Sequence, residues 1–174
     1  MLHPNVIGDW QEYDEDFTGL RVRVHSFEKG DVPRRGRDDE AKGLTYFSFQ
    51  VTVENRAEEY FDLRLYRNEV QIRAGKDGHS AFLDVYGSVW IEDFRLYPLR
   101  RASATIYAAA LASHLKTLDI QIAMRVDHED TDPYVWLGSD GVPESTGRTA
   151  AKKTSGKGIA DEVSKFLEQG GADA

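Results

Sequence analysis

The chain has 174 residues, a formal net charge of −8 and no cysteine. Without cysteine it has no disulfide, no thiolate nucleophile and no cysteine-based zinc site. Its negative charge repels phosphate backbones, and no apolar stretch of the sequence reaches membrane-spanning length. We therefore expect neither a nucleic-acid nor a membrane partner.

The composition is that of a folded protein, with 40% hydrophobic and 30% charged residues. This length suits one domain with an appendage. The opening residues, Met1-Leu2-His3-Pro4-Asn5, do not lead from a basic segment into an apolar run, as an export signal would. From this pattern we expect a cytoplasmic protein, either free or incorporated in a particle or assembly.

Alternating apolar and polar residues predict β-strands from Val6 to about Leu137. The first clear strand covers residues 20–25, and the alternation is strongest at 45–55. Between these two segments, residues 29–43 combine glycine, proline and a mixed run of charges, so we expect an exposed loop there.

The middle of the chain continues the strand pattern. A strand or pair of strands is expected at 62–74. It is followed by a tight turn at Gly75-Lys76-Asp77-Gly78, where two glycines supply the positive φ angles that a hairpin needs. An apolar series from Phe82 to Leu96 then ends at Pro98, which marks the end or edge of a strand.

Residues 103–113 are ambiguous, because their alanines favour a helix by intrinsic propensity. We interpret them as a strand, since they lie between strand patterns. Residues 118–126 follow with a clean alternation of apolar and polar side chains, and we predict that this segment is the antiparallel partner of 103–113.

The C-terminal part of the sequence differs from the rest. We divide the chain into a β-sandwich domain at 1–137, a flexible linker at 138–157 that is rich in glycine and hydroxyl residues, and an amphipathic helix at 158–170. The apolar positions of the helix are Ile159, Val163, Phe166 and Leu167. Because so short a helix is marginal alone, this stripe should bind either the sandwich or a groove on a partner.

The order of these elements resembles the small bacterial immunoglobulin-like domains of unknown function that are often found on secreted proteins and lipoproteins. The resemblance covers about residues 19–126. It rests on an opening strand at 19–24, a long strand ending in a polar turn at 46–55, the turn Leu96-Tyr97-Pro98-Leu99 and a closing strand at 118–122. It implies an all-β, immunoglobulin-like antiparallel β-sandwich and supplies no catalytic residues.

Three departures from this family stand out. The sequence has no export signal or lipid-attachment cysteine, Leu99 occupies the position after Pro98 where the family has glycine, and the linker and helix are additional.

One loop is the best candidate for a metal site. The run from Asp127 to Asp132 contains the hard oxygen ligands that calcium prefers, with Asp127, Glu129, Asp130 and Asp132 as candidate ligands. The spacing is not that of an EF-hand, because the loop has no central glycine and no distal glutamate. We therefore interpret the run as a solvated acidic turn, with calcium binding as the alternative.

A second candidate is an exposed aromatic surface made by Trp10, Trp90 and Trp136 with the Tyr60-Phe61 and Tyr66 region. In a small sandwich such residues are more often core or half-buried side chains. If two of them proved exposed and adjacent, a partner would be sought there first. For catalysis, the sequence has neither a metalloprotease helix motif nor a nucleophile turn of the G-x-S-x-G type, so we expect no enzyme.

We therefore expect a non-enzymatic module for protein binding or a structural accessory role, such as a subunit of a phage-like or secretion-type assembly. The helix residues named above would add a tethered second contact, and a homo-oligomer is compatible with this role. The alternative is a protein that binds calcium or a small ligand through Asp127 to Asp132. No cofactor is expected unless calcium is one.

Overall fold

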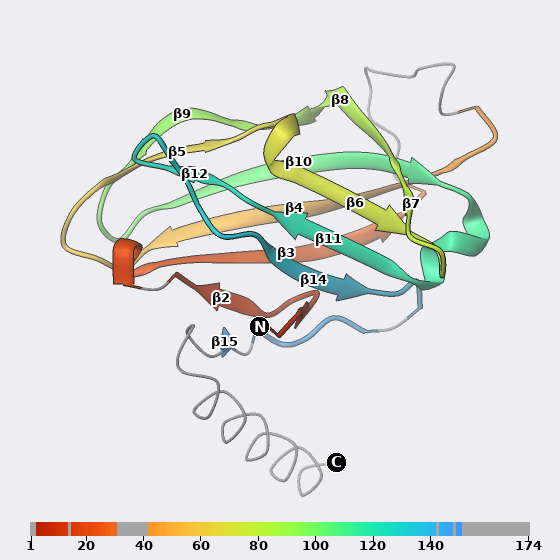
Figure 1. Ribbon diagram of the computed structural model, residues 1–174, viewed down its shortest axis with the longest axis horizontal. Helices are drawn as coiled ribbons and strands as arrows, with labels where there is room; N and C mark the ends of the chain where they lie inside the picture. Colours follow the sequence, from red (N-terminus) through yellow and green to blue (C-terminus); the bar gives the residue numbers. More distant parts are fainter. Residues whose placement is uncertain (1–2, 14, 31–41, 142, 148, 151–174) are drawn as a thin grey trace, which may run out of the picture.

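The computed structural model describes residues 3–13, 15–30, 42–141, 143–147 and 149–150. Within this part of the chain the strands form three sheets, which we call A, B and C (Figure 1). In spatial order, sheet A contains β1 (Asn5–Val6), β14 (Tyr134–Gly138), β11 (Leu118–Ile122), β6 (Val70–Ala74) and β7 (His79–Ser80). Sheet B contains β15 (Thr149–Ala150), β2 (Trp10–Glu12), β3 (Leu20–Lys29), β4 (Thr45–Asn55), β10 (Arg101–Ala110) and β8 (Phe82–Val89). Sheet C contains β13 (Glu129–Asp130), β12 (Arg125–Val126), β5 (Phe61–Leu65) and β9 (Ile91–Leu96).

Short 3-10 turns connect some of these strands: η1 (Glu15–Phe17), η3 (Arg67–Glu69) and η4 (Ala112–Lys116). Most strand pairs are antiparallel, while β1 with β14 and β15 with β2 are parallel. The predicted fold class, an antiparallel β-sandwich, is confirmed.

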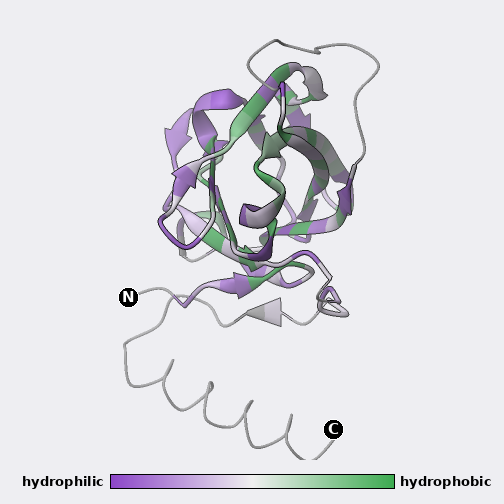
Figure 2. Cartoon of the chain, turned by 90° about the vertical axis from the view of Figure 1, so that its right-hand side faces the viewer, coloured by the Kyte–Doolittle hydropathy of each residue, from purple (hydrophilic) through white to green (hydrophobic). Residues whose placement is uncertain are grey.

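One apolar core fills the space between the sheets. Phe49 and Val51 of β4 and Ile120 and Ile122 of β11 are all fully buried and belong to the same cluster. In the end view of Figure 2, apolar segments surround the interior and hydrophilic segments lie mainly outside. The alternation read from the sequence therefore marks the faces that meet in the core, as expected for strands with one buried side.

The alanine-rich segment is a strand, β10, as predicted. It lies between β4 and β8, and its register places Ala108 beside Phe47 and Ile106 beside Phe49. Small side chains on β10 leave room for the phenylalanines of β4, which explains why packing overrides the helix propensity of alanine.

The predicted partner of this strand is wrong. We expected 118–126 to pair with 103–113, but β11 pairs with β6 and β14 in sheet A. The connection through η4 carries the chain out of sheet B, and Leu115 of η4 is buried in the core. A connection of this length can close a hairpin or change sheets, and local alternation does not distinguish the two.

Two predicted turns are present. β6 and β7 are joined by the hairpin at 75–78, where Gly75 has φ 83° and Gly78 has φ 67°. The N–H of Gly78 donates a 3.1 Å hydrogen bond to the carbonyl of Gly75. β9 ends at Leu96, two residues before Pro98, so the proline does mark a strand end.

The described part of the predicted linker contacts the sandwich. β14 extends to Gly138, the N–H of Ser145 donates a 2.8 Å hydrogen bond to the carbonyl of Ile7, and β15 pairs with β2. Gly138 thus belongs to sheet A, and Thr149–Ala150 forms an edge of sheet B. Residues 142, 148 and 151–157 of the linker predicted for 138–157 lie outside the described residues, and the division into domain, linker and helix stays a prediction. The helix predicted at 158–170 and most of the loop predicted at 29–43 lie outside the described residues.

Candidate interaction surface

Asn55 joins two loops at one end of the sandwich. Its buried side chain donates to the carbonyl oxygens of Glu59 (2.7 Å) and Leu96 (3.0 Å) and accepts from the N–H of Ala57 (2.8 Å). Its main chain donates to the carbonyl of Arg100 at 3.1 Å. The loop after β4 (56–60) and the loop after β9 (97–100) are therefore fixed to one residue. We call this region the Asn55 end.

Three large apolar side chains are exposed on these two loops. Tyr60 is 47% exposed, Tyr97 56% and Leu99 79%. The rings of Tyr60 and Tyr97 lie 5.9 Å apart, and Leu99 follows in the same turn as Tyr97. Exposed apolar side chains that lie next to one another are a common feature of surfaces that bind partners.

Arg95 extends this surface onto the outer side of sheet C. Its guanidinium carbon lies 4.2 Å from the centre of the Tyr60 ring, and its Nε donates a 2.9 Å hydrogen bond to Asp62. That hydrogen bond lowers the pKa of the Asp62 carboxyl and raises the pKa of Arg95, so the pair stays charged. Tyrosine and arginine are the residue types that most often dominate binding energy at protein interfaces.

A second group of side chains covers Trp10 on the outer face of sheet B. The guanidinium of Arg21 lies 4.0 Å from the Trp10 ring centre, with those of Arg23 and Arg101 at 5.7 and 5.9 Å. Glu54 of β4 lies opposite Arg21 of β3 and Arg101 of β10 in the register, and it contacts them at 3.1 Å and 2.7 Å. Trp10 is thus buried by arginines.

The three tryptophans do not form an exposed aromatic platform. Trp10 and Trp136 are buried, and Trp90 is half-buried against Tyr66 at 5.4 Å. The indole N–H groups of Trp136 and Trp90 donate to the carbonyls of Asp9 (3.0 Å) and Val85 (2.9 Å). Of the aromatic candidates named from the sequence, Tyr60 is the one that the structure exposes, and it meets Tyr97, which sequence reasoning missed.

The predicted calcium loop forms a tight hairpin between β12 and β13. Asp127 and His128 occupy its turn, with φ 51° and 67°, as in the two-residue turns that suit hairpins. The Asp127 carboxylate accepts from the N–H of Asp62 at 2.9 Å, and that of Asp130 lies 3.4 Å from Nε of Arg125. The side chains of Glu129 and Asp132 are exposed.

These four carboxylates do not converge on one point. Among the described residues, no group of three or more histidine, aspartate or glutamate side chains is placed to hold a metal ion. Calcium binding by this loop stays a prediction.

Two histidines that are far apart in the sequence stack on each other. The rings of His79 and His114 lie 5.3 Å apart and almost parallel, at the same end of the sandwich as the hairpin at 75–78. His25 instead lies on the outer face of sheet B, where Nε2 is 2.7 Å from the Thr52 hydroxyl and Nδ1 is 2.9 Å from that of Ser26. Both arrangements depend on strand register, which explains why the sequence did not reveal them.

No helix among the described residues is both long and apolar enough to cross a membrane. The helix side chains predicted to bind a partner, Ile159, Val163, Phe166 and Leu167, lie outside the described residues.

No protein-family model matches the chain, and neither does any curated protein. Solved structures share the β-sandwich fold. The secreted protein MPT63 of Mycobacterium tuberculosis is 14% identical, with 78% of this chain and 98% of that chain covered and a TM-score of 0.49. An uncharacterised β-sandwich protein of Clostridium difficile is 12% identical, with 78% and 94% covered and a TM-score of 0.43.

A candidate lipoprotein of Bacillus subtilis, YcdA, is 7% identical, with 69% of this chain covered and a TM-score of 0.49. This chain spans only 36% of the length of that lipoprotein. Likeness at this level concerns the fold and assigns no activity or partner to the chain.

The predicted cytoplasmic location is corrected by these comparisons. A secreted protein and a candidate lipoprotein are among the proteins of similar fold, which contradicts the cytoplasmic assignment. The prediction failed because it rested on the lack of a recognisable export signal in the sequence, and we withdraw it.

Proposed function

We propose that the chain is a non-enzymatic, protein-binding β-sandwich module that meets its partner with the Asn55 end. The observation that carries this proposal is the gathering of Tyr60, Tyr97 and Leu99, all exposed, on two loops that one buried asparagine fixes. Fixed loops lose little conformational freedom on binding, so their apolar side chains can contribute most of their burial energy to affinity.

The chemistry of the exposed residues supports binding rather than catalysis. The polar side chains of this end are engaged with one another, as Arg95 is with Asp62 and Arg101 with Glu54. A general acid or base would need a carboxyl or imidazole held in an apolar pocket. Tyrosine and arginine beside apolar side chains are instead the composition of an interface centre. A module of this kind fits an accessory subunit of a larger assembly.

The proposal is tested with the double variant Tyr60→Ser/Tyr97→Ser. Wild-type and variant proteins are immobilised and exposed to extract from the cells that naturally produce the chain. Captured proteins are then quantified by mass spectrometry. We expect at least one protein to be captured by the wild type and to fall about tenfold or more with the variant, because interface tyrosines commonly contribute at least about 1.4 kcal/mol.

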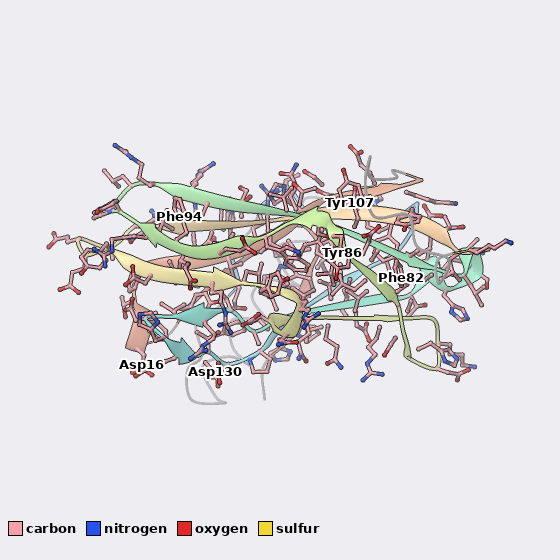
Figure 3. All side chains as sticks on the ribbon, turned by 90° about the horizontal axis from the view of Figure 1, so that it is seen from above. Asp16, Phe82, Tyr86, Phe94, Tyr107 and Asp130 are labelled. Atoms are coloured by element: carbon pink, nitrogen blue, oxygen red, sulfur yellow. The ribbon has the colours of Figure 1, made fainter. Side chains whose placement is uncertain are left out.

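The matched control is Tyr86→Ser/Leu111→Ser. Tyr86 is 88% exposed on β8 and Leu111 is exposed beside η4, so two large apolar side chains are again removed. Figure 3 places Tyr86 near the middle of the long axis of the molecule, away from its ends. An identical captured set for wild type, variant and control would overturn the proposed surface.

A second contact is proposed for the apolar stripe Ile159, Val163, Phe166 and Leu167. Val163→Asp/Phe166→Asp removes the apolar character of this stripe while keeping the chain length. If the stripe contributes a tethered second contact, this variant should weaken the capture that Tyr60→Ser/Tyr97→Ser also weakens. Unchanged capture by Val163→Asp/Phe166→Asp would remove the stripe from the proposal.

A further inference from the structure

Four arginines surround Trp10 and Glu54 on the outer face of sheet B. We call Arg21, Arg23, Arg56 and Arg101 the Trp10 arginine cluster. Three of them share a single carboxylate: Glu54 contacts Arg21 at 3.1 Å, Arg101 at 2.7 Å and Arg56 at 3.9 Å. Three of them also face the Trp10 ring within 6 Å of its centre. They come from two strands and one loop, brought together by the β2–β3–β4–β10 register.

The cluster carries more positive charge than its neighbours neutralise. Among the described residues, three of the four guanidiniums contact Glu54, and Glu12 lies opposite Arg21 in the register. This excess stands out on a chain whose net charge is −8. The side chains of Arg56 and Arg101 are 56% and 64% exposed, so a ligand can reach both guanidiniums although each contacts Glu54. Among the described residues, the buried Nε of Arg21 has no hydrogen-bond acceptor.

We propose that the Trp10 arginine cluster binds a carboxylate-rich polypeptide segment, which makes the partner of this module an acidic protein. The inference rests on the proposed function and gives the chemistry of the partner. Guanidinium groups bind carboxylates in pairs of parallel hydrogen bonds, and the packing of Arg21 and Arg23 against Trp10 holds their planes in place.

The contacts of Glu54 favour a carboxylate over other anions. Its two oxygens already sit among the guanidiniums of Arg21 and Arg101, so the cluster has the spacing that a carboxylate requires. The exposed tyrosines of the nearby Asn55 end would add apolar contact area for a polypeptide that is bound at the cluster.

The test uses fluorescein-labelled poly-L-glutamate as the probe and measures its binding by fluorescence anisotropy. We expect saturable binding by the full chain that weakens with added salt, since exposed charge pairs are screened. Arg56→Gln/Arg101→Gln removes the two exposed arms and should weaken binding about five- to tenfold. Glu54→Gln removes the internal carboxylate that competes with the probe and should strengthen binding several-fold.

The charge-matched control is Arg67→Gln/Arg73→Gln, which removes two exposed arginines of η3 and β6. It should bind the probe as the wild type does. Thermal melting shows whether each variant is folded. Because Arg56 and Arg101 are exposed, their double variant keeps the test decisive even if Glu54→Gln does not fold.

Several outcomes would overturn the inference. Wild-type protein that does not bind poly-L-glutamate, or an equal loss in the control, removes the cluster as its site. Binding of heparin or single-stranded DNA without binding of poly-L-glutamate would assign the cluster to sulfate or phosphate. The proposed function is tested separately from this inference. If Tyr60→Ser/Tyr97→Ser abolishes partner capture while Arg56→Gln/Arg101→Gln leaves it intact, the module binds a protein, but the inference that this protein is acidic is wrong.

Discussion

The N–H of Leu99 donates a 2.8 Å hydrogen bond to the carbonyl of Asn55, and Leu99 has a left-handed backbone with φ 62°. Pro98 precedes it, and the N–H of Arg100 closes the turn on the carbonyl of Tyr97 at 3.2 Å. This is the arrangement of a type II turn, whose third position favours glycine. Leucine therefore occupies a position where a side chain strains the backbone.

Leu99→Gly should stabilise the fold. Glycine adopts the left-handed conformation without strain, so the substitution removes roughly 1 kcal/mol or more of backbone strain from the folded state. Glycine also gives the unfolded chain more conformational freedom, which lowers the stability of the folded state by about 0.5–1 kcal/mol. We expect the free energy of unfolding, measured by urea titration, to rise by about 0.5 kcal/mol. The control is Leu111→Gly, since Leu111 is also exposed but has φ −59°; that variant should be destabilised.

Asn55→Ala should destabilise the protein strongly. The change leaves the carbonyls of Glu59 and Leu96 and the N–H of Ala57 without their side-chain partner. Unsatisfied buried groups cost about 1–3 kcal/mol each, so we expect a loss of about 2–4 kcal/mol in urea unfolding. Asn68→Ala, at an exposed position of η3, should change stability by less than about 0.5 kcal/mol. Similar losses for both variants would contradict the role assigned to Asn55.

Acidification should weaken the fold through His25. Burial first, and then the nearby Arg23, lower the pKa of His25, while Glu144 raises it. The unfolded chain therefore binds this proton more readily than the folded protein. The free energy of unfolding should fall as pH drops below the ordinary histidine pKa of about 6.5, and stop falling below the pKa of the folded state.

His25→Gln should remove this part of the pH dependence. Urea titrations at a series of pH values on either side of the ordinary histidine pKa measure it. His128→Asn is the control, because His128 is exposed in the β12–β13 turn, and the acid-dependent loss should persist there. A His25→Gln profile with the slope of the wild type would show that other groups are responsible.

Calcium should leave the melting temperature unchanged. The Asp127 and Asp130 carboxylates are engaged with the main chain of Asp62 and the side chain of Arg125, so they do not form a shared calcium site. A ligand that bound only the folded state would raise the melting temperature. Thermal melts with calcium and with a chelator measure the difference. A rise that Asp130→Asn/Asp132→Asn abolishes would instead establish the calcium site predicted from the sequence.

The strands were predictable because their signal is local. Side chains alternate with a period of two, so segments such as Thr45–Asn55 reveal one buried face without knowledge of their partners. Strand pairing is not local. Nothing in the alternation of 118–122 shows that this segment joins β6 and β14 rather than β10, because each of these strands offers it an apolar face.

The candidate surface was predictable only in part. Tyr60 stood out as an aromatic residue, and Leu99 stood out where glycine was expected. Their proximity depends on Asn55, which connects loops more than 35 residues apart in the sequence. The Trp10 arginine cluster was not predicted, since Trp10, Arg21, Glu54 and Arg101 meet only through the register of four strands.

The hydrogen bonds of Asn55 reach main-chain atoms of the two loops rather than their side chains. Side chains at residues 58–60, and at 97 and 99, can therefore be exchanged while the bases of both loops stay anchored. This separation makes the end of the sandwich suitable for directed evolution: a library that randomises these positions would yield new binding specificities on an unchanged scaffold.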